Sequence, residues 1–393
     1  MANTYVRTLG RIRLSVSLFY FITGLTFASW ASRIPDIRHA LGLSDGALGM
    51  VLFAIPAGQL AMMALSGLLV ARLGSRKVIL FATLGYACVL CGIAASGSVA
   101  ALAVCLFFFG AMANMLNIAI NTQAVFLERQ YGRPIMASFH GMWSLGGFAG
   151  GVLGTVFAAS GLPLGCHYAT VLALSAANSL ANRRYLVRED RAAAGAGDEK
   201  GFRFADIEGL IVLLGVTGFC GMFCEGTVYD WSSVYFSSVV RPSDALIRAG
   251  YIAGMAAMTC GRFLADRFVA RFGSSAVLRA CGGLIVAGLL LATALPRLVP
   301  ATLGFLLVGA GISSTVPICY SIAGRHSSMK VSTAITLVSS ISFIGFLVGP
   351  PVIGLVAEMS GLRLSLAMAS VFGLAIALLA GVINRRVGAK AKA

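Results

Sequence analysis

Long apolar segments alternate with short polar loops along almost the whole chain. Each apolar segment is close to the ~20 residues that an α-helix needs to cross the hydrocarbon core of a bilayer. Helices are expected because lipid offers the backbone no hydrogen-bond partner. The pattern predicts an all-α membrane protein with twelve transmembrane helices, at residues 12–32, 46–70, 76–96, 99–126, 136–160, 163–182, 207–234, 245–265, 275–295, 300–322, 331–357 and 363–384.

The two halves of the chain resemble each other. Residues 70–75 (VARLGS) return as residues 269–274 (VARFGS), an offset of 199 in a chain of 393 residues. The same offset relates two G-x-x-x-G pairs, which allow helices to cross closely, at Gly146, Gly150, Gly345 and Gly349. Duplicated halves in an apolar chain are typical of secondary transporters.

The longest polar interruption separates these halves. It contains an alanine- and glycine-rich run, which favours a flexible linker. We therefore predict two pseudo-symmetric six-helix bundles, at residues 1–182 and 207–393, joined by a cytoplasmic linker at residues 183–206.

Composition and charge support a membrane protein. Hydrophobic residues make up 58% of the chain and charged residues 11%, whereas about 25% is usual for soluble domains. The net charge of +16 does not indicate nucleic-acid binding, because the basic residues lie between the apolar segments. With the N-terminus inside, 24 of the 30 Lys and Arg residues fall on the inner side. Inner loops are enriched in such residues, so both termini are expected in the cytoplasm of a bacterial inner-membrane protein.

The sequence offers no sign of an enzyme. It has no phosphate-binding G-x-x-x-x-G-K-[ST] motif, no dinucleotide fingerprint and no Ser/His/Asp arrangement. The nine cysteines fall inside or at the edge of apolar segments and are interpreted as small apolar side chains. No metal or cofactor is expected. The first apolar run is long enough to span the membrane, so we predict no cleavable signal peptide.

The loop after the second predicted span resembles the signature G-x-L-x-D-R-x-G-R-K of the major facilitator superfamily. Residues 67–77 (GLLVARLGSRK) look like this signature but lack its acidic residue, in whose place Ala71 stands. The second half keeps an acid, Asp266, in residues 261–273 (GRFLADRFVARFG). Residues 33–44 and 225–231 (EGTVYDW) are similar to the fucose-permease-like branch, including its rhizopine-locus and uncharacterised bacterial members. The resemblance covers the whole chain and implies a twelve-helix transporter of sugars or related solutes.

The repeated turn has a physical role that does not depend on this resemblance. Gly74 and Gly273 permit a tight reversal between two helices. Arginines beside the turn can bind helix carbonyls or a neighbouring acid in one conformation and lose those bonds in the other. The alternative is that they only fix topology. The gating candidates are Arg33, Arg72, Gly74, Asp266, Arg267 and Arg271.

Polar side chains inside predicted spans usually face an interior cavity. On the fourth span Asn114, Asn117 and Asn121 share one helix face, and the offset of 199 carries Ser313 onto Asn114 and Tyr320 onto Asn121. Both halves therefore have polar faces at equivalent positions, and Pro317 can kink the tenth span. Interhelical hydrogen bonding is the alternative, which we prefer for the serines. The cavity candidates are Gln59, Asn114, Asn117, Asn121, Ser313, Tyr320 and Ser340.

Three titratable residues are candidates for proton coupling. Glu225 lies within the seventh span and Asp230 near its outer end, and a carboxyl group in such a place can take up and release a proton. Arg33 is expected to reach one of them, which would make the pair a structural outer gate instead. His140, four residues into the fifth span, is either a proton relay or a packed histidine.

These observations predict a secondary transporter that works by alternating access, moves a small, neutral, hydroxyl-rich solute and is driven by protons. The expected partners are this solute, protons and lipid, and the protein is expected to be a monomer. The alternative is efflux of drugs or amphipathic compounds, because 14 Met and 24 Phe residues can line an adaptable pocket. A receptor or a simple channel fits the duplicated halves less well.

Overall fold

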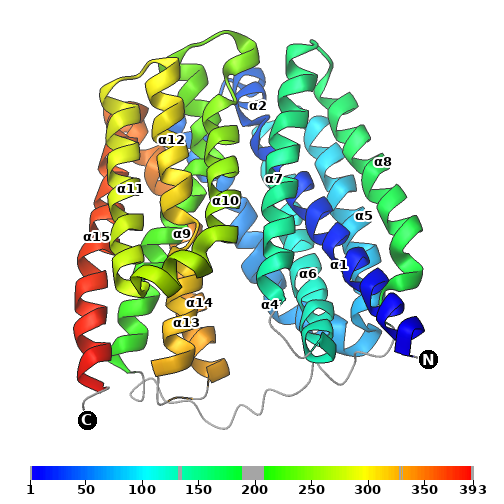
Figure 1. The fold of residues 1–393 in the computed structure, drawn as a ribbon. Helices are drawn as coiled ribbons and strands as arrows, with labels where there is room; N and C mark the ends of the chain where they lie inside the picture. The colour runs from blue at the N-terminus through cyan, green and yellow to red at the C-terminus, as the bar shows by residue number, and fades with distance from the viewer. Residues whose placement is uncertain (1, 132–134, 188–207, 327–328, 330, 391–393) are drawn as a thin grey trace. The chain divides into compact units, whose positions relative to one another are not determined.

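The structure, a computed structural model, describes residues 2–131, 135–187, 208–326, 329 and 331–390. Every regular element within these residues is a helix (Figure 1). The helices form two compact units. Unit 1 lies within Met1–Gly42 and Val51–Asp198, and unit 2 within Leu43–Met50 and Glu199–Ala393. Most of the predicted linker, residues 188–206, lies outside the described residues.

Unit 1 is built from α1, which packs along α7, and from α6, which packs along both α4 and α5. Aromatic rings fill part of its interior: Tyr86 and Trp30 both lie against Phe109, with centroids 4.2 and 6.4 Å away. The helices are α1 (Ala2–Ala31), α2 (Ile34–Leu41), α4 (Ala54–Leu73), α5 (Ser75–Ala94), α6 (Val99–Tyr131), α7 (Met136–Ala159) and α8 (Leu164–Asn182), followed by a 3-10 turn (Arg183–Tyr185).

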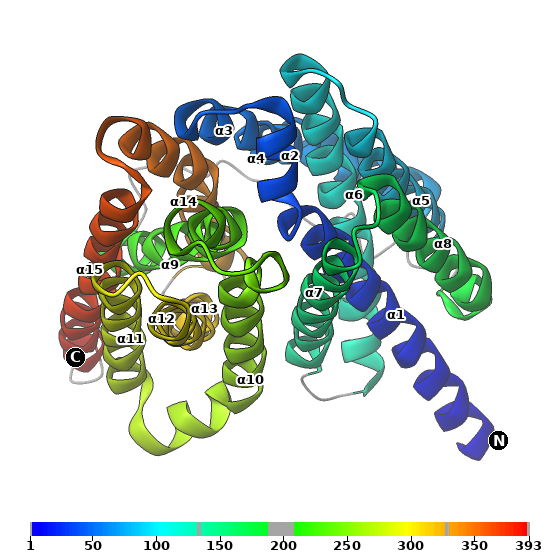
Figure 2. The ribbon, with the colours of Figure 1, turned by 90° about the horizontal axis from the view of Figure 1, so that it is seen from above.

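Unit 2 pairs α9 with α14, α11 with α15, and α12 with α10 and α11. Figure 2 shows α12 and α13 end-on beside α10 and α11. Its apolar core joins residues of α9, α11, α13, α14 and α15. The helices are α9 (Gly209–Tyr235), α10 (Ala249–Phe272), α11 (Ser274–Ala294), α12 (Leu298–Ile312), α13 (Thr315–His326), α14 (Val331–Ser360) and α15 (Leu362–Lys390), together with most of α3 (Asp45–Leu52).

Glycines allow close helix crossings at matching places in the two units. A methyl group on Gly146 would collide with the backbone carbonyl of Phe21 in α1, and one on Gly345 with the carbonyl of Phe219 in α9. The predicted role of these two glycines in close helix crossing is confirmed. It explains why α1 follows α7 and α9 follows α14 so closely.

Ten described segments are long and apolar enough to cross a membrane. The two long helices outside this set, α8 and α10, have 19 and 24 residues and are still long enough to span. Helix α10 is less apolar because it carries Arg262, Asp266, Arg267 and Arg271.

Two predicted spans are interrupted. The second span divides into α3 and α4 at Phe53, and the tenth divides into α12 and α13 at Ser313 and Ser314. The break agrees with the expected effect of Pro317, because proline has no N–H to donate to the carbonyl of Ser313, four residues earlier. Pro317 lies in the first turn of α13, where a missing N–H costs no helical hydrogen bond.

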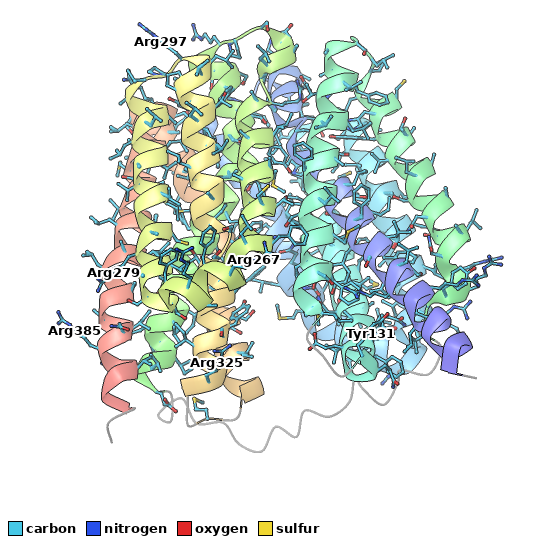
Figure 3. The ribbon with its side chains drawn as sticks, in the orientation of Figure 1. Tyr131, Arg267, Arg279, Arg297, Arg325 and Arg385 are labelled. Carbon is cyan, nitrogen blue, oxygen red and sulfur yellow. The ribbon has the colours of Figure 1, made fainter. Side chains whose placement is uncertain are left out.

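Arginines that we predicted on opposite sides of the membrane lie at opposite ends of unit 2. Figure 3 shows Arg297 at one end, where α12 begins, and Arg325 and Arg385 toward the other, near the ends of α13 and α15. The predicted orientation of the chain in the membrane stays a prediction.

Candidate functional site

Unit 1 contains a cluster of neutral hydrogen-bonding groups from three helices. The buried Tyr20 of α1 donates its hydroxyl hydrogen to Oδ1 of Asn121 in α6, at 2.6 Å. The Asn121 amide donates to the backbone carbonyl and Oδ1 of Asn117, at 2.9 and 2.5 Å. The ring of His140 in α7 meets the edge of Tyr20, with centroids 5.6 Å apart. Asn117 and His140 remain exposed, so the cluster presents polar groups at a surface of the unit.

The i, i+4 spacing of Asn117 and Asn121 places both amides on one face of α6, as the sequence predicts. Tyr20 was not among the predicted residues. Its contact with Asn121 requires α1 to pack near α6, and no local pattern in the sequence predicts which helices pack together. The ring contact at His140 fits the packing alternative, but its role as a proton relay stays a prediction.

Two further predicted amides lie on the tightly packed pair α4 and α6. The side-chain oxygens Oε1 of Gln59 and Oδ1 of Asn114 are buried and have no hydrogen-bond partner among the described residues. A buried polar atom without a partner is costly, and water or a ligand is one way to satisfy it. These two oxygens therefore have unused capacity to accept hydrogen bonds.

Unit 2 contains a charged cluster instead. In α9, Glu225 accepts a hydrogen bond from the Tyr229 hydroxyl at 2.6 Å. The same oxygen, Oε1, forms an ion pair with Nη2 of Arg262 in α10 at 2.9 Å. The side chains of Arg262 and Glu225 are only 19% and 10% exposed. Met258, one turn before Arg262, accepts a weaker contact from the same tyrosine at 3.6 Å.

The position of Arg262 corrects the sequence interpretation. Arg262 is one of the 24 Lys and Arg residues that the charge count placed on the inner side, but it lies well inside α10 and pairs with Glu225 of α9. An arginine near the predicted end of a span looks like a loop residue in a charge count. Only the neighbouring helix reveals its partner.

The expected link from Arg33 to a carboxylate of α9 would join the two units and stays a prediction. Arg33 is buried and forms an ion pair with Asp36, its Nε lying 2.5 Å from Oδ2. Asp36 follows one turn later, in the first turn of α2. Glu225 has Arg262 as its cation.

The remaining predicted residues of unit 2 have different surroundings. Asp230 is buried in α9, five residues after Glu225. Ser313 is buried at the break between α12 and α13, where its hydroxyl donates to the carbonyl of Ala310 at 2.7 Å. That bond is local to the end of α12, so the interhelical role that we preferred for the serines stays a prediction. Tyr320 packs against the apolar core, and Ser340 is exposed on α14.

The repeated turns have the predicted geometry. Gly74 and Gly273 have φ of 83° and 80°, values that favour glycine, and each donates its N–H to the carbonyl four residues earlier at 2.9 Å. Arg72, Arg267 and Arg271 are exposed, and the Arg271 guanidinium lies 5.4 Å from the centre of the Phe272 ring. The side chain of Asp266 lies outside the described part of the chain, so the latch at this turn stays a prediction.

A residue that sequence reasoning missed joins the first turn to the start of the linker. Gln123 of α6 is fully buried and donates to the Ser75 hydroxyl at 2.6 Å and to the Val187 carbonyl at 3.0 Å. Its Oε1 accepts the Val187 N–H at 3.0 Å. Every polar atom of this side chain is therefore used to hold three segments together. A polar residue near the inner end of a span was the only signal in the sequence.

Duplicated helical units with polar groups buried between their helices define a polytopic membrane transport protein. The chain belongs to the Major Facilitator Superfamily, whose family model matches residues 16–328. It is therefore a multi-pass membrane transporter and not an enzyme. The family predicted from the signature turn is confirmed.

Relatives and solved structures agree with this assignment. The chain is 32% identical to an uncharacterized MFS-type transporter of Yersinia pestis, over 95% of this chain and 96% of that protein. It is 29% identical to the membrane protein MosC of Rhizobium meliloti, over 92% and 88% of the two chains. A mutant of the nucleoside transporter NupG superposes with a TM-score of 0.78 at 15% identity, covering 95% of this chain and 99% of that one. The E. coli fucose:proton symporter FucP superposes with a TM-score of 0.61 at 18% identity, covering 95% and 98%. The predicted twelve-helix fold is confirmed.

Proposed function

We propose that this transporter moves a small, neutral, hydroxyl-rich solute, such as a sugar, a polyol or an amino sugar, by alternating access. The observation that carries the proposal is the neutral cluster of Tyr20, Asn117 and Asn121, together with the unused oxygens of Gln59 and Asn114. Amides and hydroxyls both donate and accept hydrogen bonds, as a solute with many hydroxyl groups requires. An apolar efflux substrate would leave the oxygens of Gln59 and Asn114 unpaired, at a cost.

We further propose that protons drive transport and that Glu225 carries them. The carboxylate is held by one guanidinium and one phenol in surroundings that are largely buried. Protonation would remove its charge and free Arg262, changing how α9 and α10 are held together. A charge change at one pair of helices is a suitable way to bias two conformations of a transporter. The fucose:proton symporter with the same fold supports this proposal by analogy only.

The remaining features of the transporter are proposed on the sequence. It is expected to act as a monomer in a bacterial inner membrane, with both termini in the cytoplasm. The bundles at residues 1–182 and 207–393 would move relative to each other about the linker at residues 183–206. Sensitivity of single-cysteine variants to impermeant thiol reagents on each side of the membrane would test this topology.

The test of the proposed function is uptake into proteoliposomes that carry an imposed pH gradient. The probes are radiolabelled L-fucose, myo-inositol, glucosamine and uridine, with ethidium as an amphipathic cation. We expect at least one of the first three to accumulate when the gradient points inward, and Glu225→Gln to abolish that accumulation while leaving solute exchange measurable. Asp230→Asn is the matched control, because it neutralises the other buried carboxyl group of α9.

Transport of ethidium with none of the polar probes would reject the proposed substrate class. Accumulation that ignores both the pH gradient and Glu225→Gln would reject proton coupling at this residue. If Asp230→Asn alone abolishes accumulation, the coupling residue is Asp230 and the role given to Glu225 is wrong.

A further inference from the structure

A cavity opens in unit 2 between the start of α11 and the last turns of α13 and α15. Its volume is about 470 Å³, and its lining includes Ser275 and Arg279 of α11, Ile322 of α13 and Asn384 of α15. Ile322 belongs to the apolar core of the unit, whereas Arg279 and Asn384 are exposed. The cavity therefore joins an apolar interior to a polar, positively charged edge.

A glycine makes room for the guanidinium of Arg279. A methyl group on Gly381 of α15 would lie 3.1 Å from Nη2 of Arg279 and 3.9 Å from its Cζ. At the same level, the Ser275 hydroxyl donates to the carbonyl of Ala380 at 3.1 Å, which joins α11 to α15. The packing of these two helices therefore sets the position of the charge.

The charge at this edge is not balanced by a nearby acid. Helices α11 and α15 contain no Asp or Glu, and no carboxylate of the described residues forms an ion pair with Arg279. Arg385 lies one turn after Gly381, and Figure 3 shows Arg279 and Arg385 along the same edge of unit 2. Guanidinium groups beside an amide and a hydroxyl are the donors that best match the oxygens of a phosphate group.

An apolar stripe on α15 leads to the same place. It consists of Val371, Leu374, Leu378 and Val382, which are 41–65% exposed and recur every three or four residues, so they share one face of the helix. Arg385 follows three residues after Val382 and continues this face. In a membrane such a stripe contacts acyl chains, and long arginine side chains near its end extend toward the lipid headgroups.

We propose that this cavity binds the phosphate group of an anionic phospholipid, with Arg279 as the main contact, and that the bound lipid stabilises unit 2. Basic pockets between transmembrane helices suit such headgroups. A zwitterionic phospholipid carries the same phosphate together with a cation, which the arginines would repel. A soluble phosphate compound would not use the apolar stripe. The site is separate from the solute cluster of unit 1 and from the ion pair of Glu225 and Arg262, so it goes beyond the proposed function.

The first test measures lipid retention by native mass spectrometry of the full-length protein. The detergent micelles contain either dioleoyl phosphatidylglycerol, which is anionic, or dioleoyl phosphatidylcholine, which is zwitterionic. We expect the anionic lipid to be retained at least about threefold more often, and Arg279→Gln to remove most of this preference. Arg325→Gln is the matched control, because Arg325 is exposed toward the same end of unit 2 and does not line the cavity. Equal retention of the two lipids, or equal losses in the two variants, would overturn the proposal.

A second pair of variants keeps every charge. Gly381→Leu fills the space in which the Arg279 guanidinium lies, so retention of phosphatidylglycerol should again fall at least about threefold. Gly283→Leu is its control, because a methyl group at this exposed position of α11 meets nothing within 4 Å. If both variants retain the lipid equally well, the phosphate does not bind where Arg279 lies on α15, and the assigned site is wrong.

Thermal unfolding identifies the source of the phosphate. Phosphatidylglycerol should raise the unfolding midpoint by about 3 °C or more, and by less than half as much in Arg279→Gln. Sodium phosphate and glycerophosphate at the same concentration should leave the midpoint unchanged. An equal rise with glycerophosphate would indicate a soluble phosphate compound and overturn the lipid assignment. These measurements need no transported solute, so their outcome is independent of the proposed solute class and of proton coupling.

Discussion

The two units perform the same architectural task with different chemistry. In unit 1, Tyr20 donates to a neutral amide, and the cluster it joins with Asn117 and Asn121 contains no ionised group. In unit 2, Tyr229 donates at the same distance of 2.6 Å to a carboxylate that is also held by a guanidinium. Duplication has preserved the helices and the glycine crossings but not the side chains between them. A duplicated scaffold can therefore combine a cluster of neutral polar groups in one unit with a largely buried ion pair in the other.

The largest effect is expected from a substitution in the ion pair of Glu225 and Arg262. Removing one partner of a buried ion pair leaves an uncompensated charge, so Arg262→Ala should lower the free energy of unfolding by about 3 kcal/mol and abolish accumulation. The measurement is the midpoint of denaturation of the purified protein in detergent, together with proteoliposome uptake. No single substitution in the neutral cluster of unit 1 is expected to cost as much.

The control removes both charges at once. Glu225→Gln combined with Arg262→Met should regain most of the lost stability, because no unpaired charge remains, but it should not regain proton-driven accumulation. If the double variant is as unstable as Arg262→Ala, packing of the arginine stem rather than charge pairing holds the two helices together.

The glycine crossings provide a second comparison between equivalent positions. A methyl group on Gly150 would lie 2.5 Å from the carbonyl oxygen of Leu25 and 2.8 Å from Cβ of Ala28. At Gly349, related to Gly150 by the repeat, the nearest atom is the carbonyl oxygen of Phe223 at 3.6 Å. Gly150→Ala should therefore destabilise the protein by about 2 kcal/mol through overpacking. Gly349→Ala should be neutral or slightly stabilising, because alanine favours the helix.

Thermal unfolding of the two variants measures this difference directly. Each serves as the control for the other, since the substitution and the repeat position are the same. Equal effects would mean that α9 and α14 approach each other as closely as α1 and α7 at this position.

The fold was predictable from the sequence because its determinants are local. The lengths of the apolar segments gave the helices, and Gly74 and Gly273 marked turns that require positive φ. The i, i+4 spacing of the α6 amides was likewise visible in the sequence. The partners of these residues were not, since Tyr20 is separated from Asn121 by 101 residues and Arg262 from Glu225 by 37. Such contacts depend on which helices pack together, and hydropathy does not report that.

Gln123 illustrates the same limit, because its partners are a turn and the backbone of Val187. The sequence located the polar residues within the spans. It could not show which of their side chains have hydrogen-bond partners and which have an oxygen that can still accept a hydrogen bond.

The smallest expected effect is the difference in stability between Tyr229→Phe and Tyr20→Phe. It tests whether the charge of the hydrogen-bond acceptor accounts for the difference between these two tyrosines. A hydrogen bond to a charged group contributes about 1.5–3 kcal/mol and a neutral one about 0.5–1.5 kcal/mol. Tyr229→Phe should therefore cost about 1 kcal/mol more than Tyr20→Phe, as measured by denaturation. Tyr229→Phe should also shift the pH dependence of accumulation, whereas Tyr20→Phe should mainly raise the half-saturation concentration for the solute. Tyr235→Phe is the matched control within unit 2, because that hydroxyl donates to the neutral carbonyl of Ala292 at 2.8 Å. If Tyr235→Phe costs as much as Tyr229→Phe, the difference belongs to the packing of unit 2 and not to the carboxylate.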